Sequence, residues 1–311
     1  MSIGWRNNLI HLHLILYYEV QNQMASIRGL ALNSTGIAIT DGSYQVNRNL
    51  ISEDAANIPG EPTIYGGIYN VSGAFSAAYR PQTLNTFIEL GILGKSGGGV
   101  ADTFTHYDIT LGNEFNKAWT FASCALTSCD ISMQAGQYSK CNFEWIGTYK
   151  KLSDTTIPAA DYTHEPTMFY NAYLDNIKCR GITFRIDRPL AADDTILGSE
   201  YSQTLVQTDN LTIGGTITLS NADYEMMDNV LYTSDEGAWN NDEAKNNTTL
   251  IGDLTIKFRN PSGTVDLCQI YLDEIHVQDL NVSVTGMQRF EKTVEWRAIT
   301  TSSSGITFSV P

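Results

Sequence analysis

Apolar and polar residues alternate along several stretches of the chain, with the period of two that is typical of strands buried on one face. The alternation runs through residues 131–135 and 141–145, and it returns through residues 282–284 and 294–298. Each of these two regions therefore predicts a pair of strands. In both regions the second strand ends in a Glu-Trp dipeptide.

The two predicted strand pairs are also similar residue by residue. At a spacing of 151 residues, without a gap, four identical positions coincide: Ser132/Ser283, Gln137/Gln288, Glu144/Glu295 and Trp145/Trp296. Earlier in the chain, residues 71–76 resemble residues 213–218 at a spacing of 142 residues. Self-similarity at a nearly constant spacing indicates a repeated structural unit. The sequence therefore predicts an internal duplication, with halves at 24–160 and 161–311 and a connector at 155–160.

A helix pattern follows each early strand. The first helix is predicted to begin at Pro81, which suits a first-turn position, and to end at Gly94. Its apolar stripe consists of Leu84, Phe87, Ile88 and Gly91. The second is capped by Ser220 or Asn221, and Asp223 and Glu225 suit its positive start. Its apolar stripe consists of Tyr224, Met227, Val230 and Leu231.

Each half thus predicts strands, one helix and a closing hairpin. The expected fold class is mainly β (α+β), with two tandem copies of a β-sandwich or barrel that each carry one flanking α-helix. Two long loops are also expected. Ser43–Tyr65 is the loop of the first half, and the polar Asp235–Asn247, which contains Trp239, is that of the second.

Composition excludes two broad classes. The chain has 311 residues and is 42% hydrophobic, which is enough for a core and argues against global disorder. Lys and Arg number 19 against 34 Asp and Glu, a formal net charge of −15. A protein that grips nucleic acid by its phosphates needs clustered basic residues, so that class is disfavoured. A protein that lets nucleic acid pass without binding it stays compatible with the charge.

The cysteines and the N-terminus bear on compartment and targeting. Five cysteines without a Cys-x-x-Cys spacing are interpreted as small buried hydrophobes of a reducing cytosol. Residues 1–23 contain a short apolar run, 9–16, that is too short to span a bilayer. We expect 1–23 to be an N-terminal extension, with Met24 as a natural start, or else an arm that adds a strand to a neighbour.

No catalytic set is expected. Gly94-Lys95-Ser96 resembles the end of a phosphate-binding loop, but Glu89 stands where that motif requires Gly, and the segment follows a helix. We interpret Gly97–Gly99 as a flexible turn. Glu144 and Glu295 form a carboxylate pair, but two copies of one position would have matching environments, whereas acid/base catalysis needs pKa values pushed apart.

The sequence also predicts no cofactor and no metal site. The histidines are scattered at positions 11, 13, 106, 164 and 276, and His11 and His13 lack a third ligand nearby. Asp187–Pro189 and the Asp193-Asp194 pair are interpreted as a solvated polar turn rather than a calcium site. Trp145 and Trp296 lie on the apolar face of their strands and are expected in the core, with Glu144 and Glu295 pointing away.

The segments 71–85 and 213–227, together with the hairpins ending Phe143-Glu144-Trp145 and Val294-Glu295-Trp296, resemble the tail tube (major tail) proteins of long-tailed phages and archaeal tailed viruses. The likeness is one of pattern and covers about residues 24–311. It implies a β-sandwich or small barrel with one helix, a long loop that bridges stacked rings (43–65 here, by position), and subunits that form rings around a lumen. With the domain duplicated, it implies a homotrimer that forms a pseudo-hexameric ring.

The resemblance also implies a role and partners. The chain would be a structural virion protein of the tail, assembled in the host cytoplasm, whose rings stack into a conduit for viral double-stranded DNA. Its partners would be other copies of itself and the tape measure, terminator and baseplate proteins, with no membrane. An acidic lumen would repel DNA weakly and keep it mobile, which agrees with the negative charge.

Two alternatives stay open. Another virion ring protein, such as a tail terminator, sheath or baseplate hub, would share the long strands and the duplication. A carbohydrate-binding β-sandwich adhesin would use exposed aromatic residues such as Trp239 as a platform for sugars.

Overall fold

The structure is a computed structural model of the chain, and most of the predicted strands lie within the residues that it describes. These are residues 29–53, 63–112, 118–134, 136–148, 156–157, 159–160, 162–174, 177–192, 202, 204–219, 250–283, 291–300 and 305–310. The predicted second helix, Asp193-Asp194, Trp239 and residues 1–23 lie outside them.

Antiparallel strands make up most of the described chain, so the mainly β class is confirmed. The first half contains β1 (Gly29–Leu32), β2 (Thr35–Ile37), β3 (Ile39–Glu53), β4 (Thr63–Ala78), α2 (Pro81–Thr86), η1 (Phe87–Leu93), β5 (Tyr107–Gly112), β6 (Ala118–Gln134) and β7 (Lys140–Gly147). The second half contains β8 (Met168–Leu174), β9 (Ile177–Asp187), β10 (Leu190–Ala191), β11 (Val206–Gln207), β12 (Thr212–Leu219), β13 (Leu250–Arg259), β14 (Asp266–Ser283), β15 (Glu291–Ala298) and β16 (Thr307–Ser309).

The main strands of both halves follow one order of pairing. In the first half the order is β2-β1-β5-β6-β7-β4-β3, and β2 and β3 are consecutive in the chain. In the second half it is β8-β13-β14-β15-β12-β9, and β9 pairs back onto β8. The strands that occupy equivalent places in the two halves are thus β1 and β8, β5 and β13, β6 and β14, β7 and β15, and β4 and β12. The β2-β3 segment holds the place of β9.

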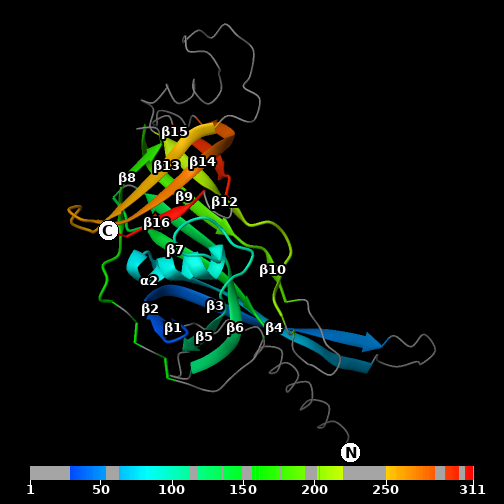
Figure 1. Cartoon of the computed structure of the whole chain (residues 1–311). Coiled ribbons are helices and arrows are strands. Elements are labelled where there is room, and N and C mark those ends of the chain that lie inside the picture. The colour runs from blue at the N-terminus through cyan, green and yellow to red at the C-terminus, as the bar shows by residue number, and fades with distance from the viewer. Residues whose placement is uncertain are drawn as a thin grey trace, which may run out of the picture.

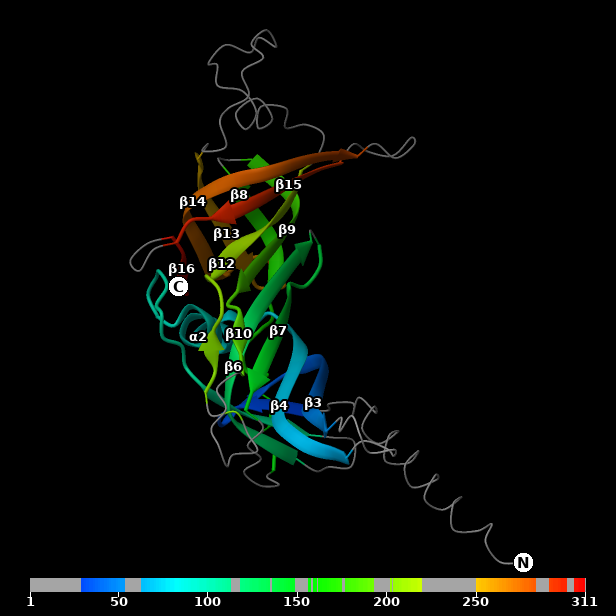
Figure 2. The same cartoon turned by 90° about the vertical axis from the view of Figure 1, so that its right-hand side faces the viewer.

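One strand pair joins the two halves into a single large sheet. β6 of the first half pairs antiparallel with β9 of the second, from Ser128 opposite Asp187 to Gln134 opposite Gly181. Figure 1 shows the first half below the second, with the long β3–β4 hairpin extending away from the body. Figure 2 shows β7, β6, β9 and β12 running side by side through the middle of the molecule. We call the β6–β9 pair the internal junction.

Strand register agrees between the halves at the spacings of the sequence match. Gly73 of β4 lies opposite Trp145 of β7, and Gly215 of β12 lies opposite Trp296 of β15. A Cβ added at Gly73 would lie 2.6 Å from Trp145 Cζ2, and one added at Gly215 would lie 3.1 Å from Trp296 Cζ2. In both halves, therefore, the indole lies against a glycine of the neighbouring strand, where a side chain would collide with it.

Irregularities in the ladders recur at equivalent places. The register shifts between Leu126 and Ser128 in the β6–β7 pair, and between Val277 and Asp279 in the β14–β15 pair. The same 151-residue spacing relates these two shifts. The shifts at 107/109 in β5 and 252/254 in β13 also correspond, as do those at 39/41 in β3 and 179/181 in β9. β-bulges are specific features of a strand pair, so their recurrence at matching positions is a further similarity between the two halves beyond strand order.

The predicted first helix is confirmed. It begins with Pro81 at its first turn, and after α2 it continues as the π-helical turns of η1 to Leu93. Gly94 then ends it in the left-handed region, with φ of 77°, where a residue with a Cβ is strained. Its predicted apolar stripe is buried. No described helix is long and apolar enough to cross a bilayer.

The predicted loop at Ser43–Tyr65 is wrong. Residues 43–53 belong to β3 and residues 63–65 to β4, which pair along most of their length as one hairpin. The sequence hides these strands because Arg48 stands where the alternation of Tyr44, Val46 and Leu50 would require an apolar residue, and because β3 borders only one described strand. An edge strand needs less apolar burial than a central one.

Candidate functional site

The described sheet carries a broad polar face on its outer side. On β7, Cys141, Phe143 and Trp145 are buried, whereas Asn142 and Glu144 are exposed. The alternation follows from strand geometry, because successive side chains point to opposite sides of a sheet. We use the name polar face for the outward-pointing residues of β7, β6, β9, β12 and β15. The expectation that Trp145 and Trp296 are core residues, with Glu144 and Glu295 facing outward, is confirmed.

Strand register sets the polar face in rows across the internal junction. One row consists of Glu295, Thr216, Thr183, Ser132 and Lys140. The next row consists of Arg297, Gly214, Arg185, Asp130 and Asn142. A third row consists of Thr212, Asp187, Ser128 and Glu144. Hydroxyl groups, a glycine and interspersed charges of both signs therefore make up the outer surface of the junction.

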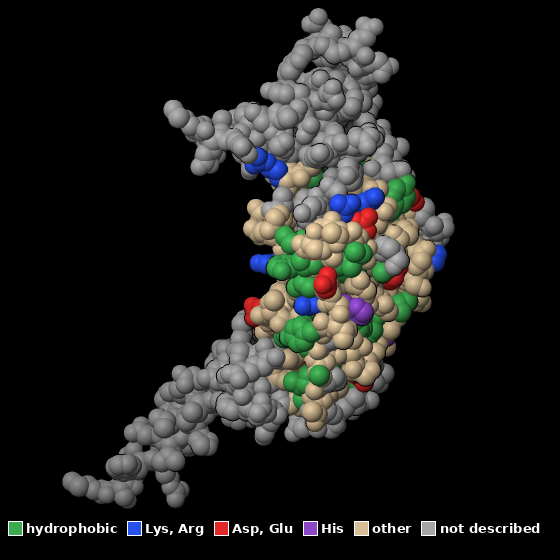
Figure 3. Space-filling model, turned by 90° about the vertical axis from the view of Figure 1, so that its left-hand side faces the viewer, with side chains coloured by type: hydrophobic (Ala, Val, Ile, Leu, Met, Phe, Trp, Pro, Cys, Tyr) green, Lys and Arg blue, Asp and Glu red, His purple; other side chains and the backbone are tan. Residues whose placement is uncertain are grey.

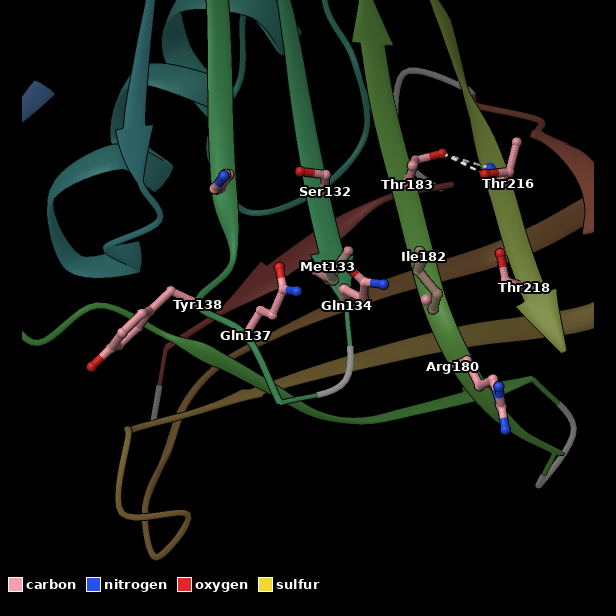
Figure 4. A pocket seen from close by; sticks show the side chains of 12 residues that line it. Ser132, Met133, Gln134, Gln137, Tyr138, Arg180, Ile182, Thr183, Thr216 and Thr218 are labelled. Carbon is pink, nitrogen blue, oxygen red and sulfur yellow. Dashed lines mark hydrogen bonds between the residues drawn. The ribbon is translucent and has the colours of Figure 1, made fainter. Parts of the chain in front are cut away.

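A hollow of about 740 Å³ lies on this face where β6, β9 and β12 run together. The Thr183 and Thr216 hydroxyls are 2.8 Å apart, and the Thr183 oxygen also accepts a 3.0 Å hydrogen bond from the Thr216 backbone N–H. Figure 4 shows Ser132, Thr183 and Thr216 on three adjacent strands, with Tyr138 to one side. The hollow is lined mainly by hydroxyl, amide and aliphatic groups, so it offers a wettable surface rather than an activated nucleophile.

Charged groups on the polar face neutralise one another locally. Arg185 forms a 3.0 Å ion pair with Asp187, and the Ser128 hydroxyl donates a 3.1 Å hydrogen bond to Glu144. The pKa of Asp130 is raised, first because partial burial disfavours its charged form, although Arg185 opposes the shift. Among the described residues of this face, acidic and basic groups are therefore interspersed, although the only charged residues that line the hollow are the basic Lys140 and Arg180.

The predicted solvated turn at Asp187–Pro189 is wrong for Arg188, whose side chain is 1% exposed. Its guanidinium donates hydrogen bonds to the carbonyl oxygens of Leu93 and Ala101, and it lies over the Phe104 ring at 5.4 Å. Burial lowers the pKa of Arg188, and the charge of Asp102 opposes that shift. The Asp-Arg-Pro sequence suggested a surface turn because the carbonyl groups that accept from Arg188 lie far away in the sequence, at the end of the first helix and in the segment after it.

The first helix and its following turn also contact the second half. The Asn85 side-chain amide donates a 3.2 Å hydrogen bond to Cys268 Sγ on β14, and the Tyr79 hydroxyl donates to the Asn85 carbonyl oxygen. The Tyr79 ring packs edge-on against Phe258, with centroids 4.9 Å apart. The Gly99 N–H donates a 2.9 Å hydrogen bond to the Ile306 carbonyl. The internal junction is thus supported on the core side by a buried contact between the halves.

The structure does not bring the sequence candidates for chemistry together. Glu144 on β7 and Glu295 on β15 are four strand spacings apart, about 19 Å along the sheet, which exceeds the separations used in glycoside hydrolysis. Gly94-Lys95-Ser96 follows the helix as a turn in which Gly97, Gly98 and Gly99 all have positive φ. Within the described ranges, no group of three or more His, Cys, Asp or Glu residues is placed to hold a metal ion.

All five cysteines are free thiols, and four of them are buried, as expected for small hydrophobic residues. Burial raises the pKa of Cys268 to about 11, so its thiol stays protonated near neutral pH. These cysteines are packing residues rather than nucleophiles.

The acidic excess of the chain is not concentrated on the polar face. Residues 220–249, between β12 and β13, contain seven Asp or Glu residues and one Lys. Figure 3 shows the side of the molecule that faces away from the viewer in Figure 2; its described surface is largely uncharged, with scattered acidic and basic groups.

The sequence matches no protein-family model, and no curated protein is significantly similar to it.

Proposed function

We propose that this chain is a structural virion protein of the tail-tube type, in which two copies of one domain are fused. Three chains form a six-lobed ring, and stacked rings form a tube through which viral DNA passes. The observation that carries the proposal is the internal junction, at which two halves with one strand order pair edge to edge into a continuous sheet. A unit that already pairs with its own equivalent is suited to repeat that pairing around a ring.

Duplication is supported by details that composition does not produce. The Gly-Trp pairs at 73/145 and 215/296 and three recurring register shifts fall at equivalent positions. Two unrelated β-domains would share a strand order far more readily than the same bulges, because bulges depend on local sequence. The flanking helix of the second half, predicted at 220–231, is part of the proposal.

We propose that the polar face lines the bore of the tube. DNA moves through a channel without being held when no group of the wall binds its phosphates, and strong phosphate binding requires clustered Lys and Arg. On this face, the basic residues are interspersed with acidic ones: Lys140, Arg180, Arg185 and Arg297 with Asp130, Glu144, Asp187 and Glu295. Hydroxyls and mixed charges therefore favour passage, and the net charge of −15 on each chain adds a weak overall repulsion. No enzymatic step or cofactor is part of this function.

Negative-stain microscopy of the purified full chain tests the proposal. We expect rings or tubes of uniform diameter, with three-fold symmetry and six lobes in end views, and an assembled fraction that increases with protein concentration. Mass measurement in solution gives the number of chains per ring. A chain that stays monomeric at high concentration across a range of salt conditions, with or without tail-initiating proteins, would contradict the proposal.

A further inference from the structure

The internal junction has two partners, and each has a counterpart elsewhere in the same chain. Residues 128–132 of β6 correspond to residues 279–283 of β14, since both follow the same register shift and pair with equivalent residues of β7 and β15. Residues 183–187 of β9 correspond to residues 43–47 of β3, which pair in the same register with β4 as β9 does with β12. The chain therefore contains a second β6-like edge and a second β9-like edge.

Neither counterpart is covered on the relevant side by a described strand. Among the described strands, β3 pairs only with β4, whereas β9 pairs with β12 on one side and with β6 and β8 on the other. At 279–283, β14 pairs with β15, while its pairing with β13 extends no further than His276. As far as the described strands go, both edges therefore have an outer ladder that is open for pairing.

Burial shows what the missing strand changes. Ile186 on β9 is fully buried, with 0% exposure, beneath the internal junction. Its counterpart on β3 is Val46, which has an equally apolar side chain and is 39% exposed. The difference in burial between these two equivalent residues is what a strand paired along the β3 edge would remove, as β6 does for β9.

The arginine beside the junction also has a counterpart. Arg188 follows Ile186 and Asp187, and its backbone N–H donates a 2.7 Å hydrogen bond to the Thr127 carbonyl of β6. On β3, Arg48 follows Val46 and Asn47, which pair with β4 in the register in which Ile186 and Asp187 pair with β12. The open edge thus repeats the apolar–polar–arginine order of the edge that is already paired.

We propose that β14 of one copy pairs antiparallel with β3 of a second copy, in the register of the internal junction, with Asn281 opposite Gln45, Leu280 opposite Val46 and Ser283 opposite Ser43. This inference rests on the proposed function, since it specifies the contact between chains of the ring. The occupant of both open edges is a second copy of this chain, because the internal junction joins their counterparts, β6 and β9, in this way.

The contact is heterologous, with a different edge on each side. Such a contact closes a ring when the rotation per step divides a full turn, and otherwise gives an open filament. Three chains that alternate internal and intermolecular junctions would leave no β3 or β14 edge unpaired. Closure therefore removes the exposed ladders that promote uncontrolled aggregation.

Disulfide cross-linking tests the register. Directly opposed residues in an antiparallel pair are close enough for a disulfide, whereas diagonal neighbours are about 7–8 Å apart. In the double variant Gln45→Cys/Asn281→Cys, we expect oxidation of the assembled protein to give covalent trimers on a non-reducing gel, with a 45–281 linkage found by peptide mass spectrometry. The diagonal variant Gln45→Cys/Ser283→Cys should cross-link at least several-fold less.

Two matched controls complete the design. Asp130→Cys/Arg185→Cys places the same pair across the internal junction and should give a monomer with an internal disulfide. A mixture of the single variants Gln45→Cys and Asn281→Cys should give covalent dimers and no larger product, because each chain then contributes one engineered thiol. The single variants alone should stay monomeric on the gel.

The outcomes separate the two proposals. A 45–281 linkage in trimers supports both. Rings or tubes in micrographs of the same double variant without a 45–281 linkage would overturn the register and leave the tail-tube proposal standing. Neither assembly nor linkage, with the internal control disulfide formed, would overturn both.

Discussion

β3 and β9 hold equivalent places in the two halves, yet their surroundings differ. The inward-facing residues of β9, such as Phe184 and Ile186, are fully buried because β6 covers that edge. The equivalent part of β3 borders one described strand, and Val46 stays 39% exposed. Two edges with similar sequences thus differ in burial because one has its partner within the chain. If the two halves are the proposed fused copies, this difference marks the edge at which the chain would pair with another copy.

The largest expected effect comes from placing a charge at the covered edge. Ile186→Lys would bury an ammonium group beneath the internal junction, where no described carboxylate faces the core side. Burying an unpaired charge is among the most destabilising single changes, so we expect a loss of about 4 kcal/mol or more in the free energy of unfolding, or no folded protein. Urea denaturation of the purified variant measures this loss. A change below about 1 kcal/mol would mean that the junction is loosely packed.

The same charge at the open edge should leave folding intact and abolish assembly. Val46→Lys changes an exposed residue, so we expect the free energy of unfolding to change by no more than about 0.5 kcal/mol. Lysine on a strand edge opposes edge-to-edge pairing, and the variant should stay monomeric in sedimentation experiments. Gln45→Lys, one residue away on the other side of the strand, is the control and should retain more assembly. An equal loss of assembly in the Val46→Lys and Gln45→Lys variants would argue against the proposed register.

The two glycines under the tryptophans compare the rigidity of the two edges. A Cβ at Gly215 would lie 1.8 Å from the Thr183 carbonyl oxygen of β9, whereas one at Gly73 would lie 2.6 Å from the Ser43 carbonyl oxygen of β3. β9 is held between neighbours on both sides, whereas β3 borders one described strand and should yield more readily. The close approach of a Cβ at Gly73 to the buried Trp145, 2.6 Å from Cζ2, adds to the cost of that change. We expect Gly215→Ala to lower the free energy of unfolding by about 3 kcal/mol, and Gly73→Ala to lower it by about 1 kcal/mol. Parallel thermal denaturation curves give the comparison, and the reverse order would refute it.

The smallest effect concerns Asp130, whose counterpart in β14 is Asn281. Because burial raises the pKa of Asp130 in the folded chain, folding favours its protonated form, and stability declines as pH rises through the unfolded and then the folded pKa. Asp130→Asn should therefore be slightly more stable than the parent at pH 7, by less than about 1 kcal/mol, and equal to it near pH 3. Denaturation at both pH values tests the sign. A less stable variant at pH 7 would show that the Arg185 attraction dominates.

Local patterns were enough to predict the strands that are buried on one face. Residues 141–145 and 294–298 alternate clearly, and Trp145 and Trp296 are in the core as expected. The first helix was predictable because Pro81 and Gly94 mark its two ends. Such elements depend on neighbours in sequence and therefore leave a local signal.

Features that depend on distant segments were not predictable. Nothing near Ser132 or Thr183 in the sequence indicates that β6 and β9 pair, because register between strands far apart is set by the whole packing arrangement. Arg188 had the appearance of a surface residue because its carbonyl partners, Leu93 and Ala101, lie in another part of the chain. The polar face itself follows from the junction, so its rows were hidden for the same reason.

Covalent linkage of the halves changes how steeply formation of the proposed ring depends on protein concentration. The segment between Gly147 and Met168 ties each β6 to its β9 partner, so half of the six contacts form at an effective concentration set by the tether rather than by the solution. Ring formation then scales with the third power of chain concentration, where six separate domains would require the sixth. Fewer bodies also lose less translational freedom. Under this proposal, complete rings would form at lower protein concentrations than six separate domains would need.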